Sequence, residues 1–168
     1  MELQSTIIGL SILALCIYTF ILLGRSRRNK EKRLIGQLNK LASARNKAIK
    51  ELEIGFDFAL AIDDTEEYLY FTKENQAEFD DQVIALSGVR KCEMITLKKR
   101  LAKEEYLNKI TLIFTTTSDD SQNHSIVLFD SDKTSLPNGE PMIAIRWVEK
   151  VSGIVQKRKP KMAMRKAV

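Results

Sequence analysis

The first 24 residues hold the longest uncharged stretch of the chain, and a basic run follows it directly. Residues 3–24 contain no charged side chain, and twelve of them are Leu, Ile or Phe. As a helix with a rise of about 1.5 Å per residue, the segment would be roughly 33 Å long, against a hydrocarbon core of about 30 Å. A cleaved secretory signal would carry its basic residues before the apolar run rather than after it. The pattern predicts a retained transmembrane helix over residues 3–24.

Six of the next nine residues are basic, namely Arg25, Arg27, Arg28, Lys30, Lys32 and Arg33. Lys and Arg beside a membrane helix remain on the cytoplasmic side, so this flank orients the chain. We expect a single-pass protein of the cell inner (plasma) membrane, with its N-terminus outside and its C-terminal domain cytoplasmic.

A helical pattern continues through the basic juxtamembrane segment, residues 25–54. A seven-residue repeat follows Leu34, Leu38, Leu41, Arg45, Ala48 and Leu52, with the arginine interrupting the apolar seam. The pattern predicts a helical stem that ends at Gly55 and is typical of a short oligomerising coil. A helix that lies on its own domain, or a simple stalk, is the alternative.

From Phe56 onward apolar and polar residues alternate, which is the period of a strand. The expected strands cover residues 57–63, 68–71, 83–86, 89–97, 107–117 and 125–129, with the first two as a hairpin over 57–72. Polar or charged stretches at 73–81 and 98–105 predict loops. Pro141 then begins an amphipathic helix with Trp147 as its core anchor, and the basic tail 157–168 is expected to be disordered.

The chain is therefore predicted to be α+β, with a transmembrane helix (3–24), a stem (25–54), a small antiparallel sheet or split barrel closed by a C-terminal amphipathic helix (55–156), and a tail (157–168). The domain is built from the hairpin F-D-F-A-L-A-I-D-D-T-E-E-Y-L-Y-F, the strands V-R-K-C-E-M-I and I-T-L-I-F-T-T-T, and the helix around I-R-W-V-E-K-V. This order of elements resembles the pleckstrin-homology-like split barrel, including membrane-anchored bacterial versions. The resemblance implies seven strands in the full form and binding of lipid headgroups or peptides.

The net charge of +5 conceals a segregation of charge along the sequence. Residues 25–33 carry net +5 and residues 157–168 carry net +6, whereas residues 55–156 carry net −7. A nucleic-acid-binding domain usually places its basic charge on the folded part, so no nucleic acid is expected as a partner. Basic segments at both ends suit an anionic membrane surface better.

Few residues are suited to catalysis or metal binding. Three acidic pairs, Asp63-Asp64, Asp80-Asp81 and Asp119-Asp120, lie at expected turns or loops, where Asp commonly caps the backbone. His124 lies in a polar turn, and Cys92 on an alternating strand is expected in the core. One histidine and two cysteines offer little for a metal site. We expect no enzyme activity, catalytic residue, metal or cofactor, unless Asp63, Asp80 and His124 face one pocket.

The expected function is a membrane-tethered, non-enzymatic interaction module, or an accessory subunit of a membrane complex, that binds a protein partner or a second copy at the cytoplasmic face. The N-terminal helix would contact membrane lipid. The alternative is a lipid-headgroup-binding, membrane-sensing domain. Candidate contacts to lipid or partner are the basic residues Lys98, Lys99, Arg100, Lys103, Lys157, Arg158, Lys159 and Lys161, beside Arg90 and Lys91.

Overall fold

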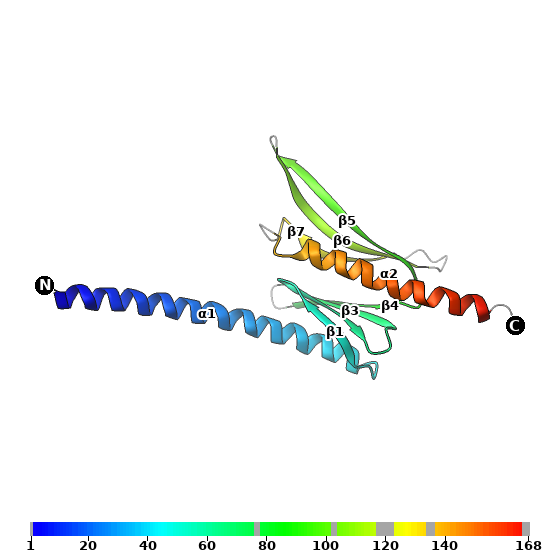
Figure 1. Cartoon of the computed structure of the whole chain (residues 1–168), viewed down its shortest axis with the longest axis horizontal. Coiled ribbons are helices and arrows are strands. Elements are labelled where there is room, and N and C mark those ends of the chain that lie inside the picture. The colour runs from blue at the N-terminus through cyan, green and yellow to red at the C-terminus, as the bar shows by residue number, and fades with distance from the viewer. Residues whose placement is uncertain (1, 76–77, 102–103, 117–122, 134–136, 166–168) are drawn as a thin grey trace.

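Two long helices and seven strands make up the part of the chain that the structure, a computed structural model, describes (Figure 1). The described residues are 2–75, 78–101, 104–116, 123–133 and 137–165, without the side chains of 2–11, 20, 22–23, 101, 104 and 159–165. The helices are α1 (Glu2–Ser43) and α2 (Glu140–Arg165). The strands are β1 (Ile49–Ile54), β2 (Phe58–Asp63), β3 (Tyr68–Asn75), β4 (Glu78–Ala85), β5 (Val89–Leu101), β6 (Glu104–Thr116) and β7 (His124–Asp130).

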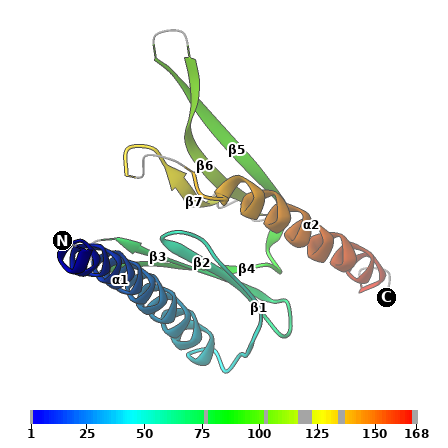
Figure 2. The same cartoon turned by 60° about the vertical axis from the view of Figure 1, so that its left-hand side comes forward.

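The strands form two antiparallel sheets in chain order, β1-β2-β3-β4 and β5-β6-β7. This confirms the α+β class and the closing C-terminal helix. The core lies between the two sheets and α2 (Figure 2). Strand β2 is buried along its whole length, because its alternate residues serve two layers. Phe58, Leu60 and Ile62 enter the main core, whereas Ala59 and Ala61 face α1.

The C-terminal part of α1 packs on the outer face of the four-stranded sheet. Leu34, Leu38 and Ala42 are buried against Ala59, Ala61 and Tyr70. The small alanines allow the helix to approach the sheet closely. Of the interpretations of the repeat, the helix that lies on its own domain is the one observed. Leu34 and Leu38 are buried and are not available for an oligomerising coil.

The helix predicted to reach residue 54 ends eleven residues earlier, which corrects the predicted stem. Asn46 adopts a left-handed conformation with φ of 53°, and the amide of Lys47 donates to the carbonyl of Ala42 at 3.1 Å. Asn is one of the few residues that tolerates this helix-ending conformation. The following segment K-E-L-E-I alternates with period two and forms β1. Gly55 lies between β1 and β2 and does not end a helix.

Gly55 has no room for a side chain. A Cβ at this position would lie 2.3 Å from a ring carbon of Phe58, whose side chain is fully buried. We expect Gly55→Ala to destabilise the full-length protein by about 1–3 kcal/mol, because the ring has to leave its packed position. Gly36→Ala in α1 is the control, since nothing lies within 4 Å of its Cβ, and it should stabilise the helix slightly. Thermal unfolding followed by circular dichroism compares them, and equal midpoints would contradict the prediction.

Three segments predicted as loops or disorder are regular structure. Residues 73–81 include the facing ends of β3 and β4, and residues 98–105 include those of β5 and β6. In residues 98–105 the charges pair across strands, as between Arg100 and Glu105 at 3.0 Å, so charge density did not indicate a loop there. The backbone of α2 continues to Arg165, because Lys, Arg, Met and Ala favour helix. Residues 166–168 and the predicted turn at 118–122 lie outside the described residues.

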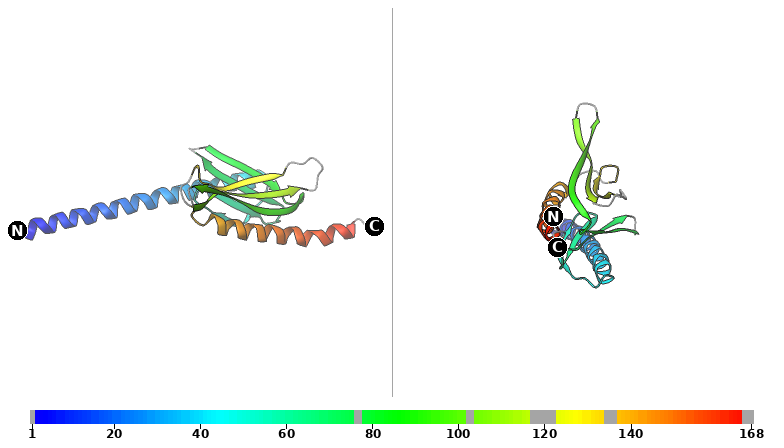
Figure 3. Two further views of the ribbon diagram at one scale, coloured as in Figure 1. Left: turned by 90° about the horizontal axis from the view of Figure 1, so that it is seen from above. Right: turned by 90° about the vertical axis from the view of Figure 1, so that its right-hand side faces the viewer.

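The N-terminal half of α1 extends away from the sheets along the long axis of the molecule, while α2 ends at the opposite extreme (Figures 1 and 3). Within the residues and side chains that the structure describes, no helix combines the length and apolar content needed to cross a membrane. The transmembrane part of the sequence prediction is therefore unsupported by the structure.

Candidate functional site

The described side chains of the extended half of α1 are apolar and have no contact with the domain. The most exposed large ones are Ile12, Leu13, Leu15, Ile17, Tyr18 and Ile21, each more than half exposed. Thr19 donates its hydroxyl to the carbonyl of Cys16 at 2.7 Å, so its polar group is satisfied within the helix, as expected for an apolar environment. This half of α1 is an apolar surface that the rest of the described chain does not cover.

The basic flank lies where α1 meets the end of the domain. Arg33 pairs with Glu74 at 2.9 Å, and the ammonium of Lys30 lies 4.9 Å from the ring centre of Phe56. Arg27 pairs with Glu31 at 3.2 Å through Nε and is otherwise exposed. Arg25, Arg28 and Lys32 have no ion-pair partner among the described residues. The flank thus divides into cations that hold the domain and cations that face outward.

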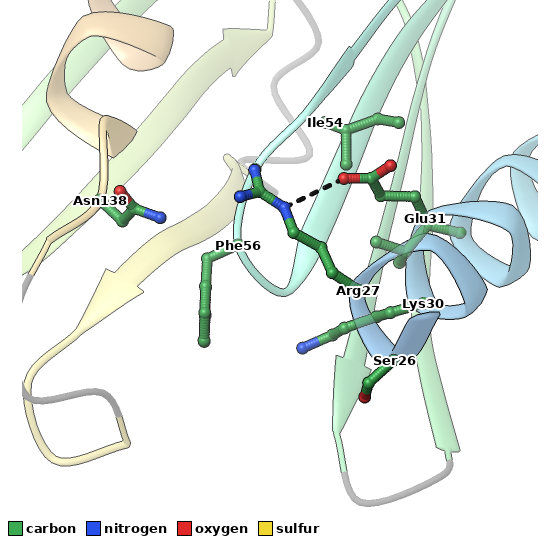
Figure 4. A pocket seen from close by; sticks show the side chains of 9 residues that line it. Ser26, Arg27, Lys30, Glu31, Ile54, Phe56 and Asn138 are labelled. Carbon is green, nitrogen blue, oxygen red and sulfur yellow. Dashed lines mark hydrogen bonds and ion pairs between the residues drawn. The ribbon is translucent and has the colours of Figure 1, made fainter. Parts of the chain in front are cut away.

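A cleft of about 420 Å³ opens between α1 and the connection from β1 to β2, which we name the α1 cleft (Figure 4). Its lining comprises Ser26, Arg27, Lys30, Glu31, Leu34, Ile54, Gly55, Phe56 and Asn138. Leu34, Ile54 and Phe56 form the apolar part of the lining, whereas Arg27 and Lys30 supply positive charge. Volumes of about 300–1,000 Å³ are usual for sites that bind small molecules. No pattern in the sequence indicates this cleft beyond an aromatic residue beside a glycine, because its two walls are distant in the sequence.

A second uncovered surface lies on the long hairpin of β5 and β6, which we name the arm. Strand β7 pairs only with residues 109–114 of β6, so the rest of the hairpin projects beyond the sheet (Figure 2). Ile95 and Leu97 are 44% and 52% exposed, and Tyr106 is also exposed. The register places Tyr106 opposite Lys99, so these apolar groups share one face with a cation. No element in the described part of the chain covers Ile95, Leu97 and Tyr106, which stay exposed.

The basic cluster predicted on the domain lies on the arm and is partly neutralised. Lys98 and Arg100 both approach Glu105, at 3.8 Å and 3.0 Å. Lys99 remains exposed without an ion-pair partner in the described part of the chain, and Lys103 lies outside it. Lys91 pairs with Glu93 at 2.7 Å. The arm is therefore a mixed apolar and basic surface rather than a dense phosphate-binding cluster.

The basic tail does not join this cluster. Lys157 lines a hollow with Glu66 and Glu149, and Arg158 donates to the carbonyl of Glu66 at 2.5 Å. The backbone of Lys159 and Lys161 continues α2, and their side chains are not described. Helix α2 ends at the opposite extreme from the projecting half of α1 (Figure 3), so the tail lies far from that half, and its described contacts are with Glu66 rather than with the arm.

The acidic pairs have structural roles where the structure describes them. Asp63 is buried and accepts from the amide of Tyr68 at 2.9 Å, which confirms backbone capping. Asp81 accepts from Thr72 at 2.7 Å and from Gln37 at 2.5 Å, and so ties α1 to the sheet. Asp119-Asp120 lie outside the described residues. No group of three or more potential metal ligands occurs among the residues described, and no pocket described there is lined by Asp63, Asp80 and His124 together.

Cys92 and Trp147 occupy the core as predicted. Burial, and secondarily the charge of Glu93, raise the pKa of the Cys92 thiol to about 12, so it stays protonated near neutral pH. Trp147 is fully buried, and its indole N–H donates to Glu53 at 2.7 Å. Glu53 also pairs with Arg146, and this hydrogen bond raises the pKa of Arg146. Sequence reasoning missed Glu53, because its strand had been assigned to a helix.

Lys73 is a second buried polar residue that the sequence did not reveal. Its ammonium donates to the carbonyls of Val127 and Leu128 at 3.2 Å and 3.4 Å and pairs with Asp57 at 3.4 Å. These contacts join β3 to β7 across the two sheets. All three of these partners are structural, so Lys73 stabilises the contact between the two sheets.

Comparison of the chain with protein-family models, with curated proteins and with solved structures finds no match in any of the three. Any functional conclusion therefore depends on the surfaces described above.

Proposed function

We propose that this chain is a non-enzymatic interaction module that α1 holds at a membrane and that binds a protein partner through the arm. The observation that carries the proposal is the location of its uncovered apolar groups. Of the thirteen large apolar side chains that are exposed among the described residues, six lie on the projecting half of α1 and three on the arm, whereas the other four are Leu52, Phe56, Met142 and Ile145. Contiguous exposed apolar surface is typical of sites that meet a membrane or another protein.

The membrane part of the proposal rests on the uncharged segment 3–24 and on the exposed side chains within it. Ile12, Leu13, Leu15, Ile17, Tyr18 and Ile21 are each more than half exposed, as a lipid-facing helix requires. The basic flank would place the domain on the cytoplasmic side of the inner (plasma) membrane. A continuous α1 would then carry the domain directly beneath the bilayer.

The partner part of the proposal rests on the composition of the arm. Strand β5 carries five basic residues and one acidic residue, within a domain that is acidic overall. Together with Ile95, Leu97 and Tyr106, this charge suits a partner surface that presents apolar groups and carboxylates. Such a partner could be another subunit of a membrane complex.

The arrangement of strands adds to this proposal without deciding it. Seven strands followed by a closing helix agree with the element order of the pleckstrin-homology-like split barrel that the sequence resembles. One fold can carry many functions, so the likeness favours binding without identifying a partner. The structural roles of Asp63, Asp81 and Cys92 also favour a binding module over an enzyme.

Polar substitutions on the arm test the proposal. We expect Ile95→Ser with Leu97→Ser to abolish recovery of a partner that cross-links to position 99 of the wild-type protein in membranes, while membrane retention is unchanged. Met142→Ser with Ile145→Ser is the matched control, because these side chains are also exposed but belong to α2 and not to the arm. The measurement is site-specific photo-crosslinking followed by identification of the adduct. Equal effects of the two pairs, or no adduct at all, would overturn the role of the arm.

Binding of a lipid headgroup is a second candidate function, and the α1 cleft is the observation that favours it. The cations expected to make this contact are dispersed, since the tail points away and Glu105 neutralises part of the arm. The cleft instead combines Arg27 and Lys30 with apolar lining residues, beside the proposed membrane segment.

A further inference from the structure

We propose that the α1 cleft is a binding site for the phosphate headgroup of an anionic phospholipid, and that this lipid fixes the orientation of the domain on the bilayer. The inference rests on the proposed tether, because the bilayer that holds α1 supplies the lipid. Arg27 and Lys30 bind the phosphate, and Phe56 enters the interfacial layer beside them.

The position of the cleft along α1 carries the first step. If the hydrocarbon core ends near Gly24, Lys30 lies six residues further along one continuous helix, about 9 Å away. Each headgroup layer is about 5–8 Å thick, so Arg27, about 4.5 Å beyond Gly24, lies within it and the backbone of Lys30 lies just outside it. The long side chain of Lys30 reaches back into the layer. The exposed ring of Phe56 is held beside the ammonium of Lys30.

The charges of the cleft carry the second step. Glu31 is the one acidic residue in its lining, and it occupies only Nε of Arg27 (Figure 4). Both terminal nitrogens of Arg27 have no ion-pair partner in the described part of the chain, and an arginine fork suits a phosphate. The neighbouring hollow shares Lys30 and Phe56, but there three carboxylates, Asp57, Glu74 and Asp132, balance Lys30, Lys73 and Lys133. Its lining has no net charge, whereas that of the α1 cleft is net positive. The charge pattern therefore selects the α1 cleft.

The exposed aromatic ring carries the third step. Phe56 lines the cleft, is half exposed and lies beside the ammonium of Lys30, so an apolar group attached to a bound phosphate would contact this ring. Free inorganic phosphate would leave the ring in contact with water. The site is thus better matched to a lipid headgroup than to a soluble anion.

The test titrates the full-length protein in a non-ionic detergent with dihexanoyl phosphatidylglycerol, dihexanoyl phosphatidylcholine or inorganic phosphate. Binding is followed from the methyl NMR signals of Leu34 and Ile54, which line the cleft. We expect saturable binding of the phosphatidylglycerol, at least about tenfold tighter than that of the phosphatidylcholine. Arg27→Gln with Lys30→Gln should weaken it about thirtyfold, from about fivefold per cation. Phe56→Ala should weaken it as well.

Arg28→Gln with Lys32→Gln is the matched control, because it removes the same charge from the same turns of α1 but outside the cleft. Equal losses in the two pairs would show general attraction to the basic flank and overturn the site. Equal affinity for the two lipids, or inorganic phosphate binding as tightly as phosphatidylglycerol, would also overturn it. Sedimentation with membranes tests the tether separately, so binding in detergent without sedimentation would reject the tether and keep the cleft.

Discussion

Leu13→Arg combined with Ile17→Arg should release the full-length chain from membranes. Both side chains are exposed on the projecting half of α1. An arginine near the centre of a membrane helix costs about 2.5–3.5 kcal/mol, and each replaced Leu or Ile also loses about 0.3–0.6 kcal/mol of favourable insertion. The pair together opposes insertion by about 6–8 kcal/mol, which is comparable with the whole apolar gain of the segment. The measurement is the fraction of protein that stays in the membrane pellet after an alkaline wash.

The control places two arginines in the flank, as Ser26→Arg with Asn29→Arg. The added charge is the same, but these positions follow the uncharged run, so retention should not fall. If the variants in the uncharged run are retained as well as the wild type, α1 does not hold the chain in a bilayer. Unchanged circular dichroism of both variants would show that the domain is intact.

Local pattern was sufficient to predict most of the domain. Alternation along residues 58–63 and 89–97 identified strands, and the apolar stripe through Trp147 identified α2. The end of α1 was missed because residues 44–54 are good helix formers, and only the left-handed turn at Asn46 and the two-residue period after it show otherwise. Burial of Leu34 and Leu38 on a sheet that comes later in the sequence is a tertiary effect, which a heptad count cannot distinguish from a coil.

The candidate sites were predicted less completely, because they join residues that are distant in the sequence. The basic flank was identified by composition, but its division between Arg33, held by Glu74, and outward-facing Arg27 depends on the packing of α1. The α1 cleft forms because the connection between β1 and β2 at Gly55 packs beside α1. This packing is a tertiary contact, which the sequence pattern does not show. Likewise, the tail is a basic run in the sequence and was grouped with the other basic segments. In the fold, the end of α2 that carries it lies away from the projecting half of α1 (Figure 1).

Trp147 and Arg146 join α2 to β1 through Glu53. Trp147 is fully buried between the sheets, and Glu53 of β1 accepts its indole N–H and also pairs with Arg146. Trp147→Ala should lower the free energy of unfolding by about 3–5 kcal/mol, from the lost packing and the cavity. Domains are commonly stable by only about 5–15 kcal/mol, so much of this margin would be lost.

Two further variants separate volume from hydrogen bonding at the same place. Trp147→Phe keeps an aromatic ring but removes the N–H donor, and should cost less than the alanine variant. Glu53→Gln keeps an acceptor but removes the charge that Arg146 and Trp147 share, and should cost about 1–2 kcal/mol. Thermal and urea unfolding followed by far-ultraviolet circular dichroism measures all three. If Trp147→Ala unfolds at the wild-type midpoint, α2 does not close the core as described, and the domain would have to be stabilised by the packing of α1 and the two sheets alone.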